Sequence, residues 1–155
     1  MRRPIKRRKV NLADLKYQSE KVGRFVNYVM WDGKKNTARA TVHRALEAIR
    51  EDTGGDPVEV FEAAIRNASP SVEVRSRRVG GANYQVPREV RPDRRLQLSM
   101  RWIRDAARAH KGKPFHAALA TELMAASKNE GSAIKKKEDT HKMAEANRAF
   151  AHFAW

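Results

Sequence analysis

The sequence predicts a mainly α-helical domain of six helices, packed like a bundle, with one protruding β-hairpin. Apolar residues recur at three- and four-residue spacing through most of the chain, which is typical of amphipathic helices. The period changes to two between about residues 72 and 90, which is typical of strands. A length of 155 residues fits a single domain with one modest core. We therefore expect a basic flexible tail at residues 1–10 and one domain at residues 11–155 that carries the hairpin arm.

The first two helices are joined by a short polar turn. The first has an apolar face formed by Val22, Phe25, Val26, Val29 and Met30. Gly33 is well placed as the glycine that follows a helix end, and residues 34–36 are expected to fill the turn. The second helix has its apolar face on Val42, Ala45, Leu46 and Ile49. Gly54 and Gly55 are expected to end it.

The third helix has the clearest start signal in the chain. Asp56 is expected at the N-cap, Pro57 at the first helical position and Glu59 at the third, an Asp form of the capping box. The apolar face of this helix is Val60, Phe61, Ala64, Ile65 and Ala68, and Ser69–Pro70 closes it.

The hairpin follows from a change of pattern at Val72. Val72 and Val74 alternate with charged residues, a turn cluster follows at residues 80–83, and residues 84–90 return as the second strand. Pro87 then needs an outward position without a ladder bond, because proline has no N–H. A lone two-stranded hairpin is marginal in water, so it must lean on the helices or be ordered by a partner.

Three further helices complete the domain. The fourth opens at Arg91–Asp93 and ends near Gly112, and the fifth runs from Pro114 until Gly131 breaks the pattern. A sixth is expected to start near Lys137. The predicted inward faces are Leu96, Met100, Ile103 and Ala107; Phe115, Ala118, Leu119, Glu122, Leu123 and Ala126; and Met143, Ala146 and Phe150.

The charge points to a polyanionic partner. Lys and Arg total 33 against 18 Asp and Glu, so the formal net charge is +15. Such an excess opposes compaction by self-repulsion, and binding to phosphates relieves it. An anionic membrane or an acidic protein would fit in principle, but nucleic acid ranks first. There is no cysteine, no apolar stretch near the ~20 residues that span a bilayer, and no signal-peptide pattern at the start, so we expect a cytoplasmic location.

Four basic segments are candidate RNA-binding sites. The hairpin is the strongest, because forked guanidinium groups bind phosphate and stack on bases, and glycines let the tip approach a ligand closely. We also expect that so charged an arm gains nothing from packing on its own domain. The tail alone could be solubilising, and the two lysine clusters could be solvated charge. The predicted contacts are Arg2, Arg3, Lys6, Arg7, Arg8 and Lys9; Lys34, Lys35 and Asn36; Arg75, Arg77, Arg78, Gly80, Gly81, Asn83, Tyr84 and Arg91; and Lys135, Lys136, Lys137 and Arg148.

Catalytic and metal-binding patterns are absent from the sequence. The five histidines are scattered without a His-x-x-x-His pair, and no nucleophile or nucleotide-binding glycine motif occurs. We therefore expect no enzyme, cofactor, metal site or small-molecule substrate. A duplex DNA-binding protein remains an alternative, although the spread of charge over four segments favours a folded RNA. An enzyme acting on RNA is a third possibility without a candidate base.

Three segments give the chain a family resemblance. Asp-Gly-Lys-Lys-Asn at 32–36, Val-Arg-Ser-Arg-Arg-Val-Gly-Gly-Ala-Asn-Tyr-Gln-Val-Pro at 74–87, and Lys-Lys-Lys-Glu-Asp at 135–139 followed by Met-Ala-Glu-Ala-Asn-Arg-Ala-Phe at 143–150 closely resemble bacterial small-subunit ribosomal protein seven. The likeness runs from about Val22 to the C-terminus.

This resemblance implies a structural ribosomal protein. It implies primary binding to the 3′ major (head) domain of the small-subunit ribosomal RNA, which starts assembly of the head. It also implies a position near exit-site tRNA and the messenger path, beside other head and platform proteins and away from any membrane. Some family members also repress translation of their own messenger.

Overall fold

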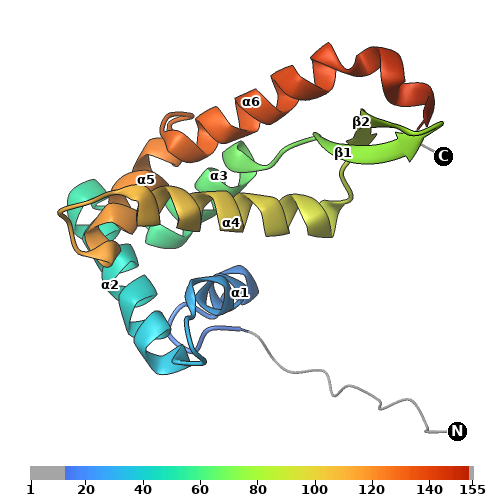
Figure 1. Ribbon diagram of the computed structural model, residues 1–155. Coiled ribbons are helices and arrows are strands. Elements are labelled where there is room, and N and C mark those ends of the chain that lie inside the picture. The colour runs from blue at the N-terminus through green and yellow to red at the C-terminus, as the bar shows by residue number, and fades with distance from the viewer. Residues whose placement is uncertain (1–12, 154–155) are drawn as a thin grey trace, which may run out of the picture.

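Figure 1 shows the computed structural model, which describes residues 13–153. Within these residues six α-helices and one antiparallel hairpin form the domain, as the sequence predicts. In chain order the elements are α1 Glu20–Val29, α2 Lys35–Thr53, α3 Pro57–Ala68, β1 Val72–Val79, β2 Ala82–Glu89, α4 Pro92–Ala109, α5 Phe115–Ser127, α6 Ser132–Ala146 and a final 3₁₀ turn, η1 Arg148–Phe153. None of the described helices is both long and apolar enough to cross a membrane.

The core forms where the predicted apolar faces meet. Helix α5 contacts α2, α3, α4 and α6, so it lies at the centre of the domain. Phe25 of α1 meets Phe61 of α3 edge to face, with ring centroids 5.3 Å apart, and both rings are fully buried. The other large, fully buried side chains are Leu46, Ile49, Met100, Ile103, Leu119, Leu123, Val22, Val26, Val42 and Val90.

The end of α2 and the start of α3 agree with the sequence, whereas the end of α1 differs. Gly54 adopts the left-handed backbone (φ 66°) after α2, and the Asp56 carboxylate accepts the N–H of Val58 at 2.9 Å to cap α3. Gly33 was wrongly assigned as the residue after α1, because α1 already ends at Val29 with Met30 as its cap. Gly33 instead has a positive φ of 71° in the turn before α2.

Helix α6 begins at Ser132, five residues before the predicted start. The carboxylate of Glu122, on α5, accepts the N–H of Ala133 at 2.8 Å and so caps the helix from outside it. Gly131 precedes the helix with a φ of 94°, and a Cβ there would lie 2.9 Å from the Glu122 carboxylate oxygen. The predicted inward face of α6 is also wrong: Met143 is 53% exposed and Ala144 is buried instead.

The hairpin turn is tighter than the sequence suggests. It consists of Gly80 and Gly81 alone, both with positive φ (58° and 89°), as a two-residue type I′ turn requires. Ala82 and Asn83, predicted in the turn, are paired in β2. Val90 donates to the Ser71 carbonyl at 3.0 Å. Because bonded and non-bonded pairs alternate, Pro87 opposite Val74 falls on a non-bonded pair, as predicted.

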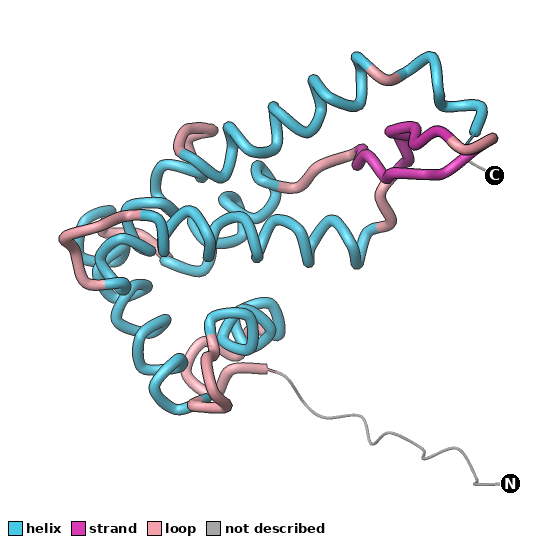
Figure 2. Tube along the Cα trace, in the orientation of Figure 1, coloured by secondary structure: helices cyan, strands magenta, loops and turns pink. Residues whose placement is uncertain are grey.

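The hairpin lies at one end of the molecule, with the α4–α5 turn at the other (Figures 1 and 2). It runs beside the end of α6 and η1 and is attached there by a small aromatic cluster. The ring of Tyr84 packs against Phe150 and Phe153, with centroid distances of 5.1 and 5.3 Å. Val86 beside it is 4% exposed. The hairpin therefore leans on the helices rather than standing free.

Candidate nucleic-acid interface

The turn between α1 and α2 presents the first group of cations. Lys34, Lys35 and Asn36 are all exposed, and Lys35 and Asn36 belong to the first turn of α2 rather than to a loop. The turn is fixed by backbone bonds from Lys34 to the Trp31 carbonyl (2.9 Å) and from Lys35 to the Gly33 carbonyl (2.8 Å). No side chain caps α2. The positive end of the α2 dipole, the backbone N–H groups of its first turn and the ammonium groups of Lys34 and Lys35 thus face the same region of solvent. This arrangement suits the binding of a phosphate.

The hairpin tip presents the second group. Arg78 and Asn83 lie directly opposite each other in the strand register, so their side chains leave the same face, and both are exposed. Gly80 and Gly81 are exposed beside them. Arg75 is also exposed, although its Nε donates to the Glu73 carboxylate at 3.2 Å. This end offers guanidinium donors, an amide and a side-chain-free backbone together.

Two predicted hairpin residues are used inside the protein. Arg77 donates from its guanidinium to the Phe153 carbonyl at 2.7 Å, and the Tyr84 ring is half-buried in the aromatic cluster. The expectation that a charged arm gains nothing from packing on its own domain is therefore wrong. The alternation correctly places Arg75 and Arg77 on one face, but only Arg75 is directed fully to solvent.

An arginine-rich hollow of about 300 Å³ lies at the base of the hairpin. Glu73 is bonded on both sides, to Arg75 and to Arg94 at 3.3 Å. Arg88 and Arg91 also line the hollow, and neither has an ion pair within the described part of the chain. Arg91 is among the contacts predicted from the sequence, whereas Arg88 and Arg94 are not. The run Arg-Pro-Asp-Arg-Arg at 91–95 was the available signal.

Helix α6 carries the third group. Lys135 and Lys136 are exposed in its second turn. Lys137 is half-buried and donates to the Asn67 carbonyl at 2.7 Å, so it ties α6 to α3. Because α6 begins at Ser132, Lys136 and Lys137 lie beyond its first turn, where the helix-dipole effect fades. Arg148, in η1, is exposed and pairs with Glu145 at 3.3 Å.

The fourth predicted group, the basic tail, lies outside the described residues. It comprises Arg2, Arg3, Lys6, Arg7, Arg8 and Lys9.

Two titratable side chains with shifted pKa values link segments that lie far apart in the sequence. Burial alone would raise the pKa of Asp14, but hydrogen bonds from His43 (3.0 Å) and from the N–H groups of Tyr17 and Lys16 outweigh it and lower the pKa. Burial and nearby Lys137 lower the pKa of His141, whose Nε2 accepts the N–H of Ser71 at 3.1 Å. Between residues 13 and 153, no three His, Asp or Glu side chains gather as a metal site would require.

The acidic residues gather elsewhere. Residues 51–65, which run from the end of α2 through most of α3, contain five acidic residues and no lysine or arginine. Glu51, Asp52, Asp56 and Glu59 are exposed. We call this stretch the acidic corner. A polyphosphate approaching the protein would be repelled here and attracted at the three basic groups.

Comparison with known proteins gives one consistent result. Residues 1–148 match the family model described as ribosomal protein S7p/S5e. The chain is 56% identical over 151 residues to the small ribosomal subunit protein uS7 of Thermoanaerobacter pseudethanolicus, covering 97% of this chain and 96% of that protein. It is 60% identical over 134 residues to uS7 of Thermotoga petrophila (86% of each chain). It is 57% identical over 144 residues to uS7 of Streptococcus thermophilus, covering 93% of this chain and 92% of that protein.

Proposed function

Because this chain belongs to the ribosomal protein S7p/S5e family, and so is an RNA-binding structural protein of the small ribosomal subunit rather than an enzyme, we propose that it is a primary binder of the head domain of the small-subunit ribosomal RNA. In this role it nucleates head assembly in the cytoplasm and lies near exit-site tRNA and the messenger path. Neighbouring head and platform proteins are its proposed protein partners. Family membership sets aside the alternatives of a duplex DNA-binding protein and an RNA-processing enzyme.

The separation of charge supports this proposal most directly. Exposed cations at the α1–α2 turn, the hairpin and α6 stand on different parts of one small domain, while five acidic residues occupy a stretch without any cation. A straight duplex touches one side of a protein, whereas a folded RNA junction can reach several sides at once. Such a protein would recognise the shape and phosphates of the junction more than its base sequence.

The proposed contacts divide by what each side chain is free to do. Exposed groups supply phosphate contacts: Lys34, Lys35, Arg75, Arg78, Arg91, Lys135, Lys136 and Arg148. Gly80, Gly81, Asn36 and Asn83 let the backbone and amides approach the RNA closely. Arg77, Tyr84 and Lys137 act mainly by holding the hairpin and α6 in place, since they are half-buried and their polar groups or rings contact other elements.

The test is a filter-binding titration of the full chain with a transcript of the head domain. The logarithm of the binding constant should fall linearly and steeply with the logarithm of salt concentration, because several phosphates are neutralised. Duplex DNA of equal length should compete at least roughly a thousandfold less well, the lower range that separates specific from non-specific binding. Equal competition by duplex DNA, or no affinity for the transcript, would contradict the proposal.

A further inference from the structure

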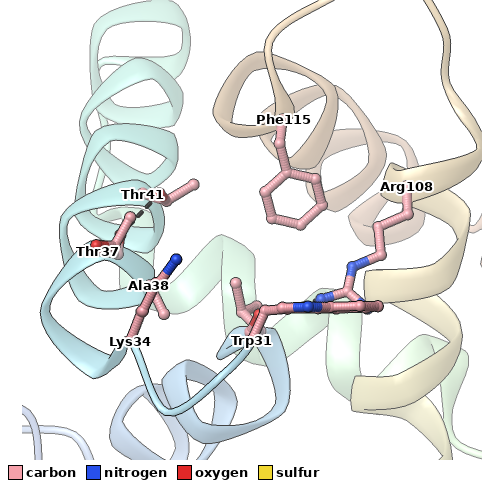
Figure 3. A pocket seen from close by; sticks show the side chains of 8 residues that line it. Trp31, Lys34, Thr37, Ala38, Thr41, Arg108 and Phe115 are labelled. Carbon is pink, nitrogen blue, oxygen red and sulfur yellow. Dashed lines mark hydrogen bonds between the residues drawn. The ribbon is translucent and has the colours of Figure 1, made fainter.

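A small pocket lies where the α1–α2 turn meets α2, α4 and α5 (Figure 3). It encloses about 230 Å³. The indole of Trp31 lies on one side, the ring of Phe115 points in from the other, and Arg108 reaches in from α4. Its lining is Val29, Trp31, Lys34, Thr37, Ala38, Thr41, Arg108 and Phe115.

Trp31 is exposed in a way that packing does not explain. It is 67% exposed, although it lies only two residues after the buried Val29. An exposed tryptophan gives up the large free-energy gain of burying an aromatic ring. Its orientation is nevertheless supported: the guanidinium of Arg108 lies 5.2 Å from the ring centroid, and the same group donates to the Val29 carbonyl at 3.1 Å. A π surface is thus held ready at the mouth of the pocket.

The charge around the pocket identifies the kind of ligand. No acidic residue lines it, and neither Lys34 nor Arg108 has an ion pair in the described part of the chain. An apolar side chain from a protein partner would gain nothing from two cations at the rim. An aromatic ring beside fixed cations suits a nucleobase with its phosphate, because bases stack on aromatic and guanidinium planes. The volume is below the ~300–1,000 Å³ of sites for drug-sized ligands.

We propose that this pocket receives one unpaired nucleobase of the ribosomal RNA. The base stacks on Trp31 and its phosphate is held by the ammonium group of Lys34. Thr37 and Thr41 line the pocket beside the base, with the Thr41 hydroxyl donating to the Thr37 carbonyl at 2.8 Å. Arg108 stays against the indole and completes the stack. The inference rests on the proposed function, since it needs the RNA to reach this face. The pocket would recognise the shape of one base, whereas the other proposed contacts recognise phosphates.

Fluorescence of a single tryptophan tests the stacking directly. The chain has three tryptophans, Trp31, Trp102 and Trp155. Replacing Trp102 and Trp155 by Phe leaves Trp31 as the only indole. Saturating this variant with the head-domain transcript should quench its emission strongly, because a stacked base lies within contact of the ring. Emission that does not change at saturation would overturn the proposal.

Binding measurements on Trp31→Leu, Trp31→Phe and Lys34→Ala provide a second readout. Trp31→Leu keeps an apolar side chain but removes the π face, and it should weaken binding about five- to hundredfold with the salt slope unchanged. Trp31→Phe should recover most of the affinity. Lys34→Ala should remove one phosphate contact and so lower the slope of log binding constant against log salt concentration by about one. Circular dichroism of each variant checks that the helices remain.

The outcomes separate this inference from the proposed function. If the wild-type chain binds the transcript and Trp31→Leu binds equally well, the pocket does not hold a base. The same conclusion follows if Leu and Phe weaken binding equally, which would indicate a structural role or contact with an apolar protein side chain. If the wild-type chain itself fails to bind the transcript, the proposed function has failed first.

Discussion

The hairpin end and the acidic corner are two exposed regions of one domain, and they differ in both charge and attachment. The hairpin at residues 72–90 carries four arginines and two glutamates, whereas residues 51–65 carry five acidic side chains and no cation. Exposed charges of either sign favour solubility, so solubility alone does not explain why the two signs occupy different segments. The separation orients the protein toward a polyanion, with the corner turned away.

Their attachment to the domain also differs. The acidic corner is backed by the core, because α3 places Phe61 against Phe25 and Leu46 of α2 is fully buried. The hairpin is held by one aromatic cluster and a few single bonds, such as the bond from Ser71 to His141. Weaker attachment suits an element that must adjust to a partner, since binding loops are drawn from the less stable parts of a fold.

The largest effect on stability is expected at the corner. Phe61→Ala should lower the free energy of unfolding by about 3–5 kcal/mol, since a fully buried ring leaves a cavity in the core. Urea unfolding followed by circular dichroism measures this. Val86→Ala in the hairpin, also a buried position, should cost no more than about 2 kcal/mol. Equal losses at the two positions would show that the hairpin is part of the main core.

The largest effect on RNA binding is expected at the hairpin. Arg75→Ala with Arg78→Ala should weaken binding to the head-domain transcript about ten- to hundredfold and lower the salt slope by about two. The matched control is Arg44→Ala with Arg66→Ala, which removes two exposed arginines from α2 and α3. Filter binding should detect less than about a twofold change in the control. A control variant as weak as the hairpin variant would contradict the asymmetry.

Loosening the hairpin without changing its charge gives an intermediate effect. Tyr84→Ala removes the ring that packs on Phe150 and Phe153. Amide hydrogen exchange in residues 72–89 should accelerate, while global unfolding changes by less than about 1 kcal/mol, because a half-exposed ring supports only this end. RNA affinity should fall a few-fold, since ordering the arm then costs entropy on binding. Unchanged exchange would mean that other contacts hold the arm.

A pH effect is expected at the hairpin end. The pKa of His141 is lowered from its ordinary value of 6.5 when the chain folds. The unfolded chain therefore binds a proton at this histidine more readily than the folded chain does. Stability should therefore be complete above pH 6.5 and fall as the pH drops below it, because protonated Nε2 no longer accepts the Ser71 N–H. His141→Gln should show a smaller fall between pH 7.5 and 5.5 in thermal unfolding. Identical pH profiles for the wild-type chain and His141→Gln would show that His141 does not cause the loss of stability.

The smallest effect is expected from reversing charge in the acidic corner. Glu51→Lys with Glu59→Lys raises the net charge by four at exposed positions. Affinity for the transcript should change by no more than about twofold at physiological salt, because charges farther than ~8–10 Å from the phosphates are screened. Tenfold tighter specific binding would indicate that the RNA passes close to the corner.

Most of the fold could be predicted because it depends on local patterns. The apolar period located α1 to α5, Asp56 and Gly54 marked helix ends, and the two-residue period located the hairpin. The start of α6 was missed, because its cap comes from Glu122 on another helix. No local pattern reports a carboxylate eleven residues away, although an acid on an otherwise apolar face was a visible signal.

The sequence predicted which segments are basic more reliably than it predicted which side chains in them are free to bind RNA. Clusters of lysine and arginine were visible in the sequence, and the exposed positions Lys34, Arg78 and Lys135 are among them. Which cations turn inward depends on tertiary neighbours: Arg77 meets the Phe153 carbonyl only because the chain end folds back along β2. Arg108 was missed for the same reason, since its partner Trp31 lies on a different element.

Hydrogen–deuterium exchange of the full chain, with and without the head-domain transcript, tests most directly whether RNA contacts the hairpin end and not the acidic corner. We predict slower exchange at residues 31–36 and 74–84 on RNA binding, and no change at residues 51–60. Protection of residues 51–60 with an unprotected hairpin tip would contradict this prediction.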